Sequence, residues 1–307
     1  MNRLSAILFL SVVLISCRRQ DNTDNDQTDS LNFAREMVRF EESQKEPAFQ
    51  GTGENTWDQN IRERGFILFE NDTYYMWYTG YREMDSATMK LGLATSSDGI
   101  NWKRYANNPL IDSLWVEDII VVKSDSVYYM FAEGSGDIAH LLASTDKIHW
   151  KELGPLDIRH VDGSPLSKGA YGTPTAWVED GIWYLLYERG DLGVWLATSS
   201  DLKTWTLKQD EPVLIPGPEL YDKFGIAVNH VVKYNGLYYA YYHATAFKDW
   251  HEWSTCVAAS TDLIHWTKFE ANPILSENKS SSILVNDGPG YRLYTMHPSV
   301  RLHLPAK

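Results

Sequence analysis

Cysteine is nearly absent from this chain of 307 residues: only Cys17 and Cys256 occur. Cys17 ends an N-terminal apolar run that is expected to belong to a targeting segment, so Cys256 has no partner inside the folded region. No intramolecular disulfide is therefore expected. Cys256 lies in the strand-like run WSTCVAAS and is interpreted as a buried packing residue.

The chain also lacks an excess of basic residues. Its formal net charge is -13, and no basic stripe interrupts the acidic balance. Such a surface repels a phosphate backbone, so nucleic acid is excluded as an expected partner, and an anionic substrate would need a local cationic pocket. The composition of 43% hydrophobic and 13% aromatic residues instead allows a large core, in one big all-β domain or two ordinary ones.

No apolar run is long enough for an ordinary membrane span. The run LSAILFLSVVLIS follows Arg3 and resembles a signal segment over residues 1–17. It ends in Leu14-Ile15-Ser16-Cys17, which resembles the lipobox of bacterial lipoproteins, and residues 18–31 read as a flexible polar tether. We expect a lipid on Cys17 to anchor the protein in the bacterial cell envelope, in the outer membrane or facing the periplasm; an ordinary secretory signal is the alternative.

One aromatic, strand-like motif recurs five times along the rest of the chain. It reads YYMWYTG, VYYMFAEG, IWYLLYERG, LYYAYYHAT and YRLYTMH. The aligned positions are Tyr75, Tyr129, Tyr184, Tyr239 and Arg292, and subtraction gives intervals of 54, 55, 55 and 53 residues. Five units of one period indicate a radial or stacked array.

A second motif follows four of these five strands. It reads ATSSDGINW, ASTDKIHW, ATSSDLKTW and AASTDLIHW, that is, a strand, a turn built on Ser/Thr-Asp, and a Trp that starts the next strand. The turn aspartates are interpreted as structural because they recur in every complete unit: Asp98, Asp146, Asp201 and Asp262.

Together the two motifs give about four short antiparallel strands per unit, the content of a propeller blade. No helical period of useful length appears, which excludes a helical solenoid. The sequence therefore predicts an all-β fold, a single five-bladed β-propeller over residues 32–307. Residues 32–42 precede the first blade and are expected to complete the fifth blade and close the ring.

Polar residues gather on one predicted rim of this propeller. The first strand of a blade lines the channel and the second returns beside it, so the start of the first and the end of the second share a rim. Strand starts offer Asp58, Arg62, Arg64, Glu117, Asp118, Thr173, Thr175, Asn229 and His230. Strand ends offer Tyr81, Arg82, Glu133, Glu188, Arg189, His243 and His297.

The chain resembles the β-propeller glycoside hydrolases, the broad group of families 43, 32, 62, 117 and 130. The motifs that carry the resemblance are WYTGY, LGLATSSDGINW, WVED and YGTPTAWVEDGIWYLLYE, and it covers roughly residues 32–305. The repeat pattern is specific for the fold and less specific for the activity.

The resemblance implies roles for three positions. A carboxylate at the start of blade 1, matched by Asp58, would serve as base or nucleophile, and one at the start of blade 2, matched by Asp118, would tune and orient. A blade-3 glutamate in a Glu-x-Pro motif would be the acid, but this chain has Gly172-Thr173-Pro174 there. The acid is then expected among Glu133, Glu188, His230 and His297.

The chemistry of glycoside cleavage supports the same candidates. One group protonates the departing oxygen and another activates water or attacks the anomeric carbon. Glu133 and Glu188 end strands beside aromatic walls that would raise a carboxyl pKa. Arg62 and Arg64 are predicted to bind substrate, for example a carboxylate or sulfate. Further substrate contacts are predicted for Thr173, His230, His243 and His297. The alternatives are structural: hydrogen-bonded core groups for the three histidines, a salt-bridge cluster for the arginines with Glu133 and Glu188 as partners, and a turn or ion-pair role for Asp58 and Asp118.

Three functions follow from this site. The first is a secreted glycosidase that acts on an oligosaccharide from the chain end, as a monomer. The second is a lipid-anchored carbohydrate-binding protein that has lost the acid, and the third is a lyase or transferase with a histidine base acting on a uronic acid. No phosphate loop, nucleophile elbow, CxxC or HExxH occurs, and the histidine spacing suggests no particular metal, so no cofactor is expected.

Overall fold

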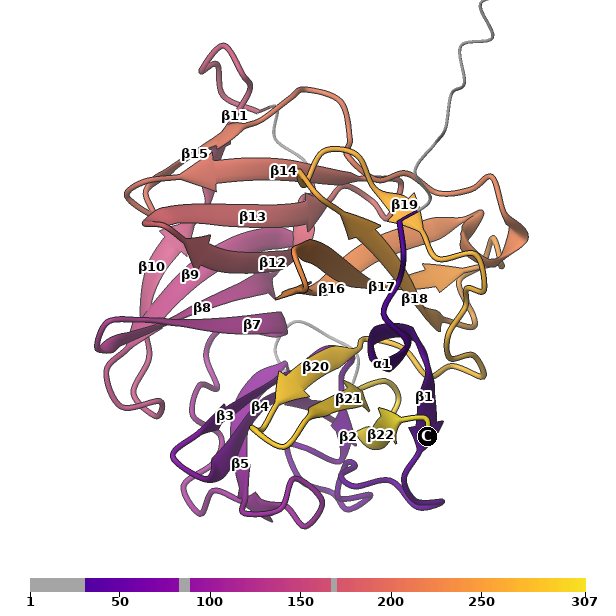
Figure 1. The fold of residues 1–307 in the computed structure, drawn as a ribbon. Helices are drawn as coiled ribbons and strands as arrows, with labels where there is room; N and C mark the ends of the chain where they lie inside the picture. Colours follow the sequence, from indigo (N-terminus) through magenta and orange to yellow (C-terminus); the bar gives the residue numbers. More distant parts are fainter. Residues whose placement is uncertain (1–30, 83–88, 167–169) are drawn as a thin grey trace, which may run out of the picture. The chain divides into compact units, whose positions relative to one another are not determined.

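Five β-sheets, each carrying one copy of the aromatic motif, surround a common centre (Figure 1). The computed structural model describes residues 31–82, 89–166 and 170–307; Cys17 and the predicted leader and tether up to residue 30 lie outside these ranges. The compact unit Asn32–Lys307 holds all five sheets. The predicted five-bladed β-propeller is confirmed.

The first two blades follow each other in the chain. Blade 1 contains β2 (Asn60–Ile61), β3 (Phe66–Glu70), β4 (Thr73–Tyr81), β5 (Lys90–Ser96) and β6 (Lys103–Arg104), with both β2 and β3 paired to β4. Blade 2 contains β7 (Glu117–Ser124), β8 (Val127–Gly134), β9 (Ile138–Ser144) and β10 (Lys151–Pro155), in that order across the sheet.

Blade 3 is larger than its neighbours. It contains β12 (Gly172–Glu179), β13 (Ile182–Glu188), β14 (Val194–Ser199) and β15 (Thr204–Leu207), and β11 (Asp157–Arg159) adds a parallel partner outside β15. Blade 4 contains β16 (Gly225–Tyr234), β17 (Leu237–Thr245), β18 (Ser254–Ser260) and β19 (Thr267–Lys268), preceded by the short 3-10 helix η1 (Leu220–Asp222).

Blade 5 is assembled from two distant parts of the chain. Its strands β20 (Ile283–Asn286), β21 (Tyr291–Thr295) and β22 (Arg301–Pro305) are joined by β1 (Phe40–Glu42), which pairs antiparallel with β22. The helix α1 (Arg35–Val38) precedes β1, and its Met37 is fully buried. This is the ring closure that the sequence predicted for residues 32–42.

The innermost strands of the five blades contact one another in sequence around the centre: β3, β7, β12, β16, β20 and again β3. Bulky side chains fill the space between blades, for example Trp77, Phe131 and Trp205, all fully buried. Truncation of one such ring to alanine costs about 3–5 kcal/mol. The blades are therefore held by packing, and Cys256 is buried among them as a free thiol.

The Ser/Thr-Asp turns have the structural role that their repetition predicted. In blade 1 the carboxylate of Asp98 accepts backbone hydrogen bonds from Ile100 at 2.9 Å and Asn101 at 2.8 Å, while Ser96 Oγ accepts from the Gly99 amide. The same pattern forms around Asp146, Asp201 and Asp262.

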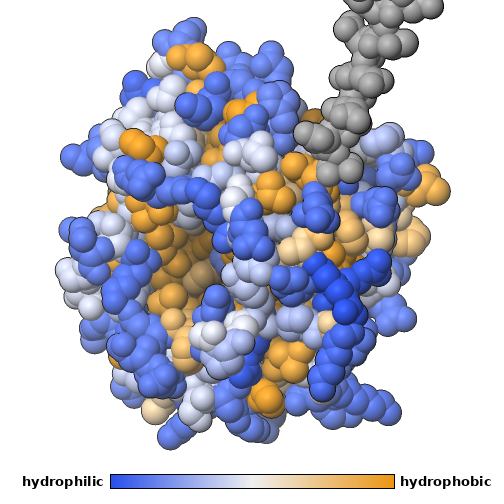
Figure 2. Space-filling view, viewed as in Figure 1, coloured by the Kyte–Doolittle hydropathy of each residue, from blue (hydrophilic) through white to orange (hydrophobic). Residues whose placement is uncertain are grey.

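The surface on the face seen in Figure 2 is largely hydrophilic, with hydrophobic residues in separate patches and in one hollow. Among the residues placed by the structure, none of the helices combines the length and the apolar character needed to span a membrane.

Candidate active site

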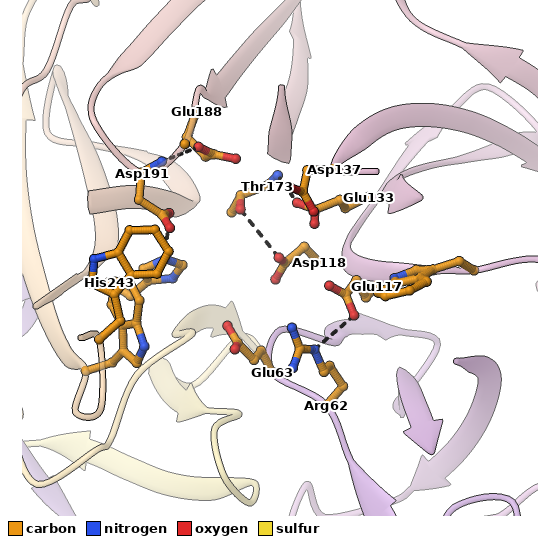
Figure 3. A pocket seen from close by; sticks show the side chains of 14 residues that line it. Arg62, Glu63, Glu117, Asp118, Glu133, Asp137, Thr173, Glu188, Asp191 and His243 are labelled. Atoms are coloured by element: carbon orange, nitrogen blue, oxygen red, sulfur yellow. Dashed lines mark hydrogen bonds and ion pairs between the residues drawn. The ribbon is translucent and has the colours of Figure 1, made fainter. Parts of the chain in front are cut away.

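A cavity of about 410 Å³ opens where blades 1 to 4 meet, within the size range of small-molecule sites (Figure 3). Half of its lining residues are acidic. The lining residues are Arg62, Glu63, Trp115, Glu117, Asp118, Glu133, Asp137, Thr173, Glu188, Gly190, Asp191, His243, Trp250 and Trp253. The rim predicted from the strand starts and ends is thus the place where this pocket forms.

Irregular starts of the innermost strands turn side chains into the pocket. Neighbouring residues of a regular strand face opposite sides, yet Glu117 and Asp118 both line the cavity. The ladder between β7 and β8 is irregular between Glu117 and Ile120, and Asp118 adopts φ 48. Blade 3 has the same irregularity at the start of β12, where Thr173 adopts φ 43. Bulges of this kind re-aim side chains and are frequent beside active sites.

The ends of the second strands supply the two glutamates. Glu133 on β8 lies opposite Glu117, and Glu188 on β13 lies opposite Gly172. Backbone amides hold both carboxylates in place. Thr173 N donates to Glu133 Oε2 at 2.8 Å, Gly172 N donates to Glu188 Oε1 at 3.1 Å, and Asp191 N donates to Glu188 Oε2 at 2.6 Å.

Crowding in a buried site raises the pKa of four carboxyls. Burial, and then the neighbouring Asp118, raises the pKa of Glu117 to about 7. Burial, and then Asp191, raises the pKa of Glu188 to about 7. Burial is also the main cause that raises the pKa of Asp118 and, together with Asp118 and Glu117, the pKa of Glu133 well above its usual range. The pocket can therefore hold protonated and ionised carboxyls together near neutral pH.

Positive charge in the pocket is already paired with these acids. Arg62 Nε donates to Glu117 Oε2 at 3.0 Å. His243 Nε2 lies 3.9 Å from Asp191 Oδ1, and its Nδ1 lies 3.0 Å from Asn229 Nδ2. Burial acts to lower the pKa of His243, but the Asp191 carboxylate outweighs it and the net pKa is raised. The expectation that two free arginines bind a substrate carboxylate or sulfate is therefore not supported.

Arg64 is a structural residue at the centre of the propeller. It is 1% exposed, and its guanidinium donates to Thr175 Oγ1 and to the backbone oxygens of Asn229, Pro174 and Asp118. One side chain of blade 1 thus ties together the innermost strands of blades 2, 3 and 4. The prediction that Arg64 binds substrate is corrected, because all these donors point at the protein.

Asp58 lies outside the pocket wall. Its carboxylate is 2% exposed and accepts hydrogen bonds from Arg104 at 2.7 Å, Tyr78 at 3.0 Å and Thr56 at 3.0 Å. Arg104 belongs to β6, the outermost strand of blade 1. Asp58 therefore joins β4 and β6 within blade 1, and the structure does not support its predicted role as base or nucleophile in the pocket.

Two predicted histidines also lie outside the lining residues. His230 Nδ1 accepts from Leu284 N at 3.1 Å, which links blade 4 to blade 5, and burial followed by Arg64 lowers the pKa of His230 to about 3. His297 Nε2 lies 3.2 Å from Asn278 Nδ2, and burial lowers its pKa. Neither histidine reaches the cavity as a substrate ligand. By contrast Thr173, His243, Arg62, Asp118, Glu133 and Glu188 do line it.

Several lining residues were not predicted as site residues: Glu63, Asp137, Asp191, Trp115, Trp250 and Trp253. Two of them had a usable signal in the sequence. Asp137 and Asp191 each stand in a Gly-containing turn directly after a strand-end glutamate, in EGSGD and ERGD. Such turns lie on the same rim as the glutamates they follow.

Three of the buried carboxyls could hold a cation. Glu117, Asp118 and Glu133 each offer an oxygen within 4.8 Å of the others, a spacing that a divalent ion can bridge. Arg62 beside Glu117 and Arg64, whose Nε lies 3.8 Å from Asp118 Oδ1, already bring positive charge to two of these three carboxyls.

Comparison with known proteins finds relatives of low sequence identity, and no protein-family model matches the chain. Among curated proteins, it is 24% identical over 226 residues to a 1,2-β-oligomannan phosphorylase of Thermoanaerobacter sp. (strain X514), covering 68% of this chain and 72% of that protein. It is also 24% identical over 287 residues to a β-1,2-mannobiose phosphorylase of the same organism, covering 68% and 94%.

Solved structures show the same fold. A glycosyl hydrolase from Bacteroides ovatus superposes with a TM-score of 0.70 at 16% identity, covering 88% of this chain and 96% of that one. A structure from work on β-1,2-mannoside-cleaving hydrolases within the GH130 family of mannoside phosphorylases gives a TM-score of 0.65 at 16% identity, covering 90% and 95%. The chain thus has the five-bladed propeller fold of these enzymes, and its resemblance to the propeller glycoside hydrolases is confirmed at the level of the fold.

Proposed function

We propose that this chain is a glycoside hydrolase that cleaves a neutral oligosaccharide, with β-1,2-linked mannosides as the first candidate substrates. The observation that carries the proposal is the set of buried carboxyls with raised pKa values around one sugar-sized cavity. Glycoside cleavage needs a protonated and an ionised carboxyl at the same pH, and this pocket provides both. The names of the two curated relatives supply the candidate linkage.

The geometry favours Asp118 as the proton donor. Asp118 lies among the other labelled acidic side chains in Figure 3, and its Oδ1 has no hydrogen-bond partner among the described residues. Burial raises the pKa of Asp118, which favours the protonated form of its carboxyl. The proton passes to the glycosidic oxygen as the bond from that oxygen to the anomeric carbon breaks.

Glu188 is the base in this proposal. Two backbone amides fix its carboxylate, and its pKa of about 7 lets it accept a proton under neutral conditions. Glu188 takes a proton from water as the water oxygen bonds to the anomeric carbon. Asp118 ends the cycle ionised and Glu188 protonated, and exchange of one proton with solvent restores both.

Water is favoured over phosphate as the attacking group. Seven carboxylates line the pocket, and a phosphate dianion among them would need strong cationic partners. Arg62 is paired with Glu117, Arg64 donates to the protein interior, and His243 is paired with Asp191. Phosphorolysis, the activity named for the two curated relatives, is therefore the second candidate, and the products distinguish it from hydrolysis.

The test is to incubate the chain with β-1,2-mannobiose in the presence and absence of inorganic phosphate. We expect mannose as product at a rate that phosphate does not change. Asp118→Asn and Glu188→Gln should each lower kcat on the order of 10²- to 10⁴-fold, because each removes one proton transfer. Asp201→Asn, in a surface turn, is the control and should keep activity.

Three results would contradict the proposal. Formation of mannose 1-phosphate only when phosphate is present would identify a phosphorylase. Full activity of Asp118→Asn would remove the proposed donor. Binding of neutral oligosaccharides without cleavage of any of them would favour the carbohydrate-binding alternative.

A further inference from the structure

The loop between β17 and β18, residues 246–253, places aromatic side chains beside the acidic pocket. Trp250 and Trp253 both line the cavity. Trp250 is 43% exposed, which is unusual for the largest apolar side chain. An exposed aromatic face next to a polar pocket indicates a ligand-binding surface.

Contacts within the protein hold the two indole rings in fixed positions. Trp250 Nε1 donates to Phe224 O at 3.1 Å, and the Trp253 amide donates to Asn278 Oδ1 at 3.0 Å. The ring of Trp253 packs edge-on against His243 with centroids 4.6 Å apart, and the rings of Trp250 and Trp253 lie 6.2 Å apart. A ligand that stacks on these rings therefore loses little side-chain entropy of the protein.

Apart from its tryptophans, the cavity is lined by polar side chains and one glycine, and most of the polar side chains are acidic. The carboxyls can bind the hydroxyl groups of a sugar ring, whereas an indole face matches the C–H face of a pyranose. A smaller cavity of about 110 Å³ is also lined by Trp253, together with Phe247 and Tyr221 among others. Trp253 thus lines both cavities, and the smaller one adds aromatic surface next to this loop.

We propose that Trp250 and Trp253 form a second sugar subsite, which stacks the neutral pyranose ring on the other side of the cleaved bond from the ring held by the carboxyls. This inference rests on the proposed hydrolase function for the position of the cleaved bond. The binding of the second ring itself does not depend on catalysis. A carboxylated or sulfated ring is disfavoured here, because Asp191 and Glu188 lie in the same wall.

The test compares a two-ring substrate with a one-ring substrate. For Trp250→Ala, the ratio of kcat/KM for β-1,2-mannobiose to kcat/KM for β-mannosyl fluoride should fall on the order of tenfold, the effect of losing one stacking contact worth about 1.4 kcal/mol. Trp250→Phe keeps an aromatic face and should recover part of the ratio. Leu153→Ala removes an exposed apolar side chain on the outermost strand of blade 2 and is the matched control.

Calorimetric titration of the Glu188→Gln protein with β-1,2-mannobiose separates this inference from the hydrolase proposal. A weaker affinity after adding Trp250→Ala supports the subsite even if the wild-type chain cleaves nothing. An unchanged kcat/KM ratio in an active Trp250→Ala enzyme overturns it. Equal affinities with and without Trp250, or no binding of the mannobiose by either protein, overturn it as well.

Discussion

Gly172 has no side chain, yet it determines how the glutamates of the pocket are placed. The amides of Gly172 and Thr173 donate to different carboxylates, Glu188 and Glu133, and the left-handed conformation of Thr173 aims the pair. A Cβ at position 172 would collide with Glu133 Oε2 and lie 2.7 Å from Glu188 Oε1. The two glutamates therefore approach each other only because this position is glycine.

Gly172→Ala should lower the proposed hydrolase activity while the fold persists. The methyl group must displace Glu133, Glu188 or both, and small displacements of catalytic groups cost on the order of 10²-fold in rate. We expect kcat on β-1,2-mannobiose to fall by that order, with a loss of unfolding free energy of about 1–3 kcal/mol from overpacking. Gly290→Ala is the control, because a Cβ there meets nothing within 4 Å. Normal kcat in a folded Gly172→Ala protein would contradict the argument.

For single residues, the sequence predicted which chain positions lie on the rim better than it predicted where their side chains point. Asp118, Glu133 and Glu188 were predicted from their places at strand starts and ends, and these places depend only on the repeat. The directions in which the side chains of Arg64 and Asp58 point depend on packing, and the spacing of the sequence repeat does not encode this packing. Asp58 precedes β2, which pairs with β4 beside the innermost β3, so its side chain meets the blade interior.

Among the secondary structure elements, the segment formed by α1 and β1 is what closes the ring. β1 pairs with β22, and α1 buries Met37 and Val38 against the propeller. The hydroxyl of Tyr241 in β17 donates to Met37 O at 2.7 Å, which also ties the segment to blade 4. The segment therefore joins two neighbouring blades.

Met37→Ala should lower the free energy of unfolding by about 2–5 kcal/mol, the usual cost of truncating a fully buried methionine. Urea denaturation followed by tryptophan fluorescence measures it. Glu41→Ala, on the exposed side of β1, is the control and should stay within about 0.5 kcal/mol of wild type. A shift below about 1 kcal/mol for Met37→Ala would mean that the segment contributes little to ring closure.

The repeat in the sequence was sufficient to predict the strands of each blade, because alternating aromatic runs and Ser/Thr-Asp turns are local signals. Two features were not predicted. The parallel partner β11 of blade 3 comes from a stretch without an aromatic motif, and the bulges at the starts of β7 and β12 arise where strands converge at the centre. Both depend on contacts between distant residues.

For the whole molecule, the acidic pocket lowers the free energy of unfolding as the pH rises. The pKa of Glu188 is raised from 4.5 to about 7 in the folded chain. A raised carboxyl pKa stabilises the fold fully below the unfolded value, and this contribution is lost as pH rises through about 7. The other buried carboxyls with raised pKa act in the same direction.

The protein should therefore be more stable at pH 5.5 than at pH 8. Glu188 alone accounts for about 2 kcal/mol of the change between these two pH values, because part of its effect is already lost at pH 5.5, above the unfolded pKa of 4.5. Urea midpoints across this range measure the slope. Glu188→Gln should make the slope smaller, and the exposed Glu219→Gln should not. Equal slopes for Glu188→Gln and wild type would show that the pKa of Glu188 is not raised in the folded chain.

Pairing of β1 with β22 also sets an order of events during protein synthesis. The other four blades each use strands that leave the ribosome close together, so each can begin to fold as it emerges. The fifth blade cannot be completed until the end of synthesis, because β22 is translated after every strand of the other blades while its partner β1 precedes them all. Until then β1 remains an unpaired edge, open to pairing with another nascent chain.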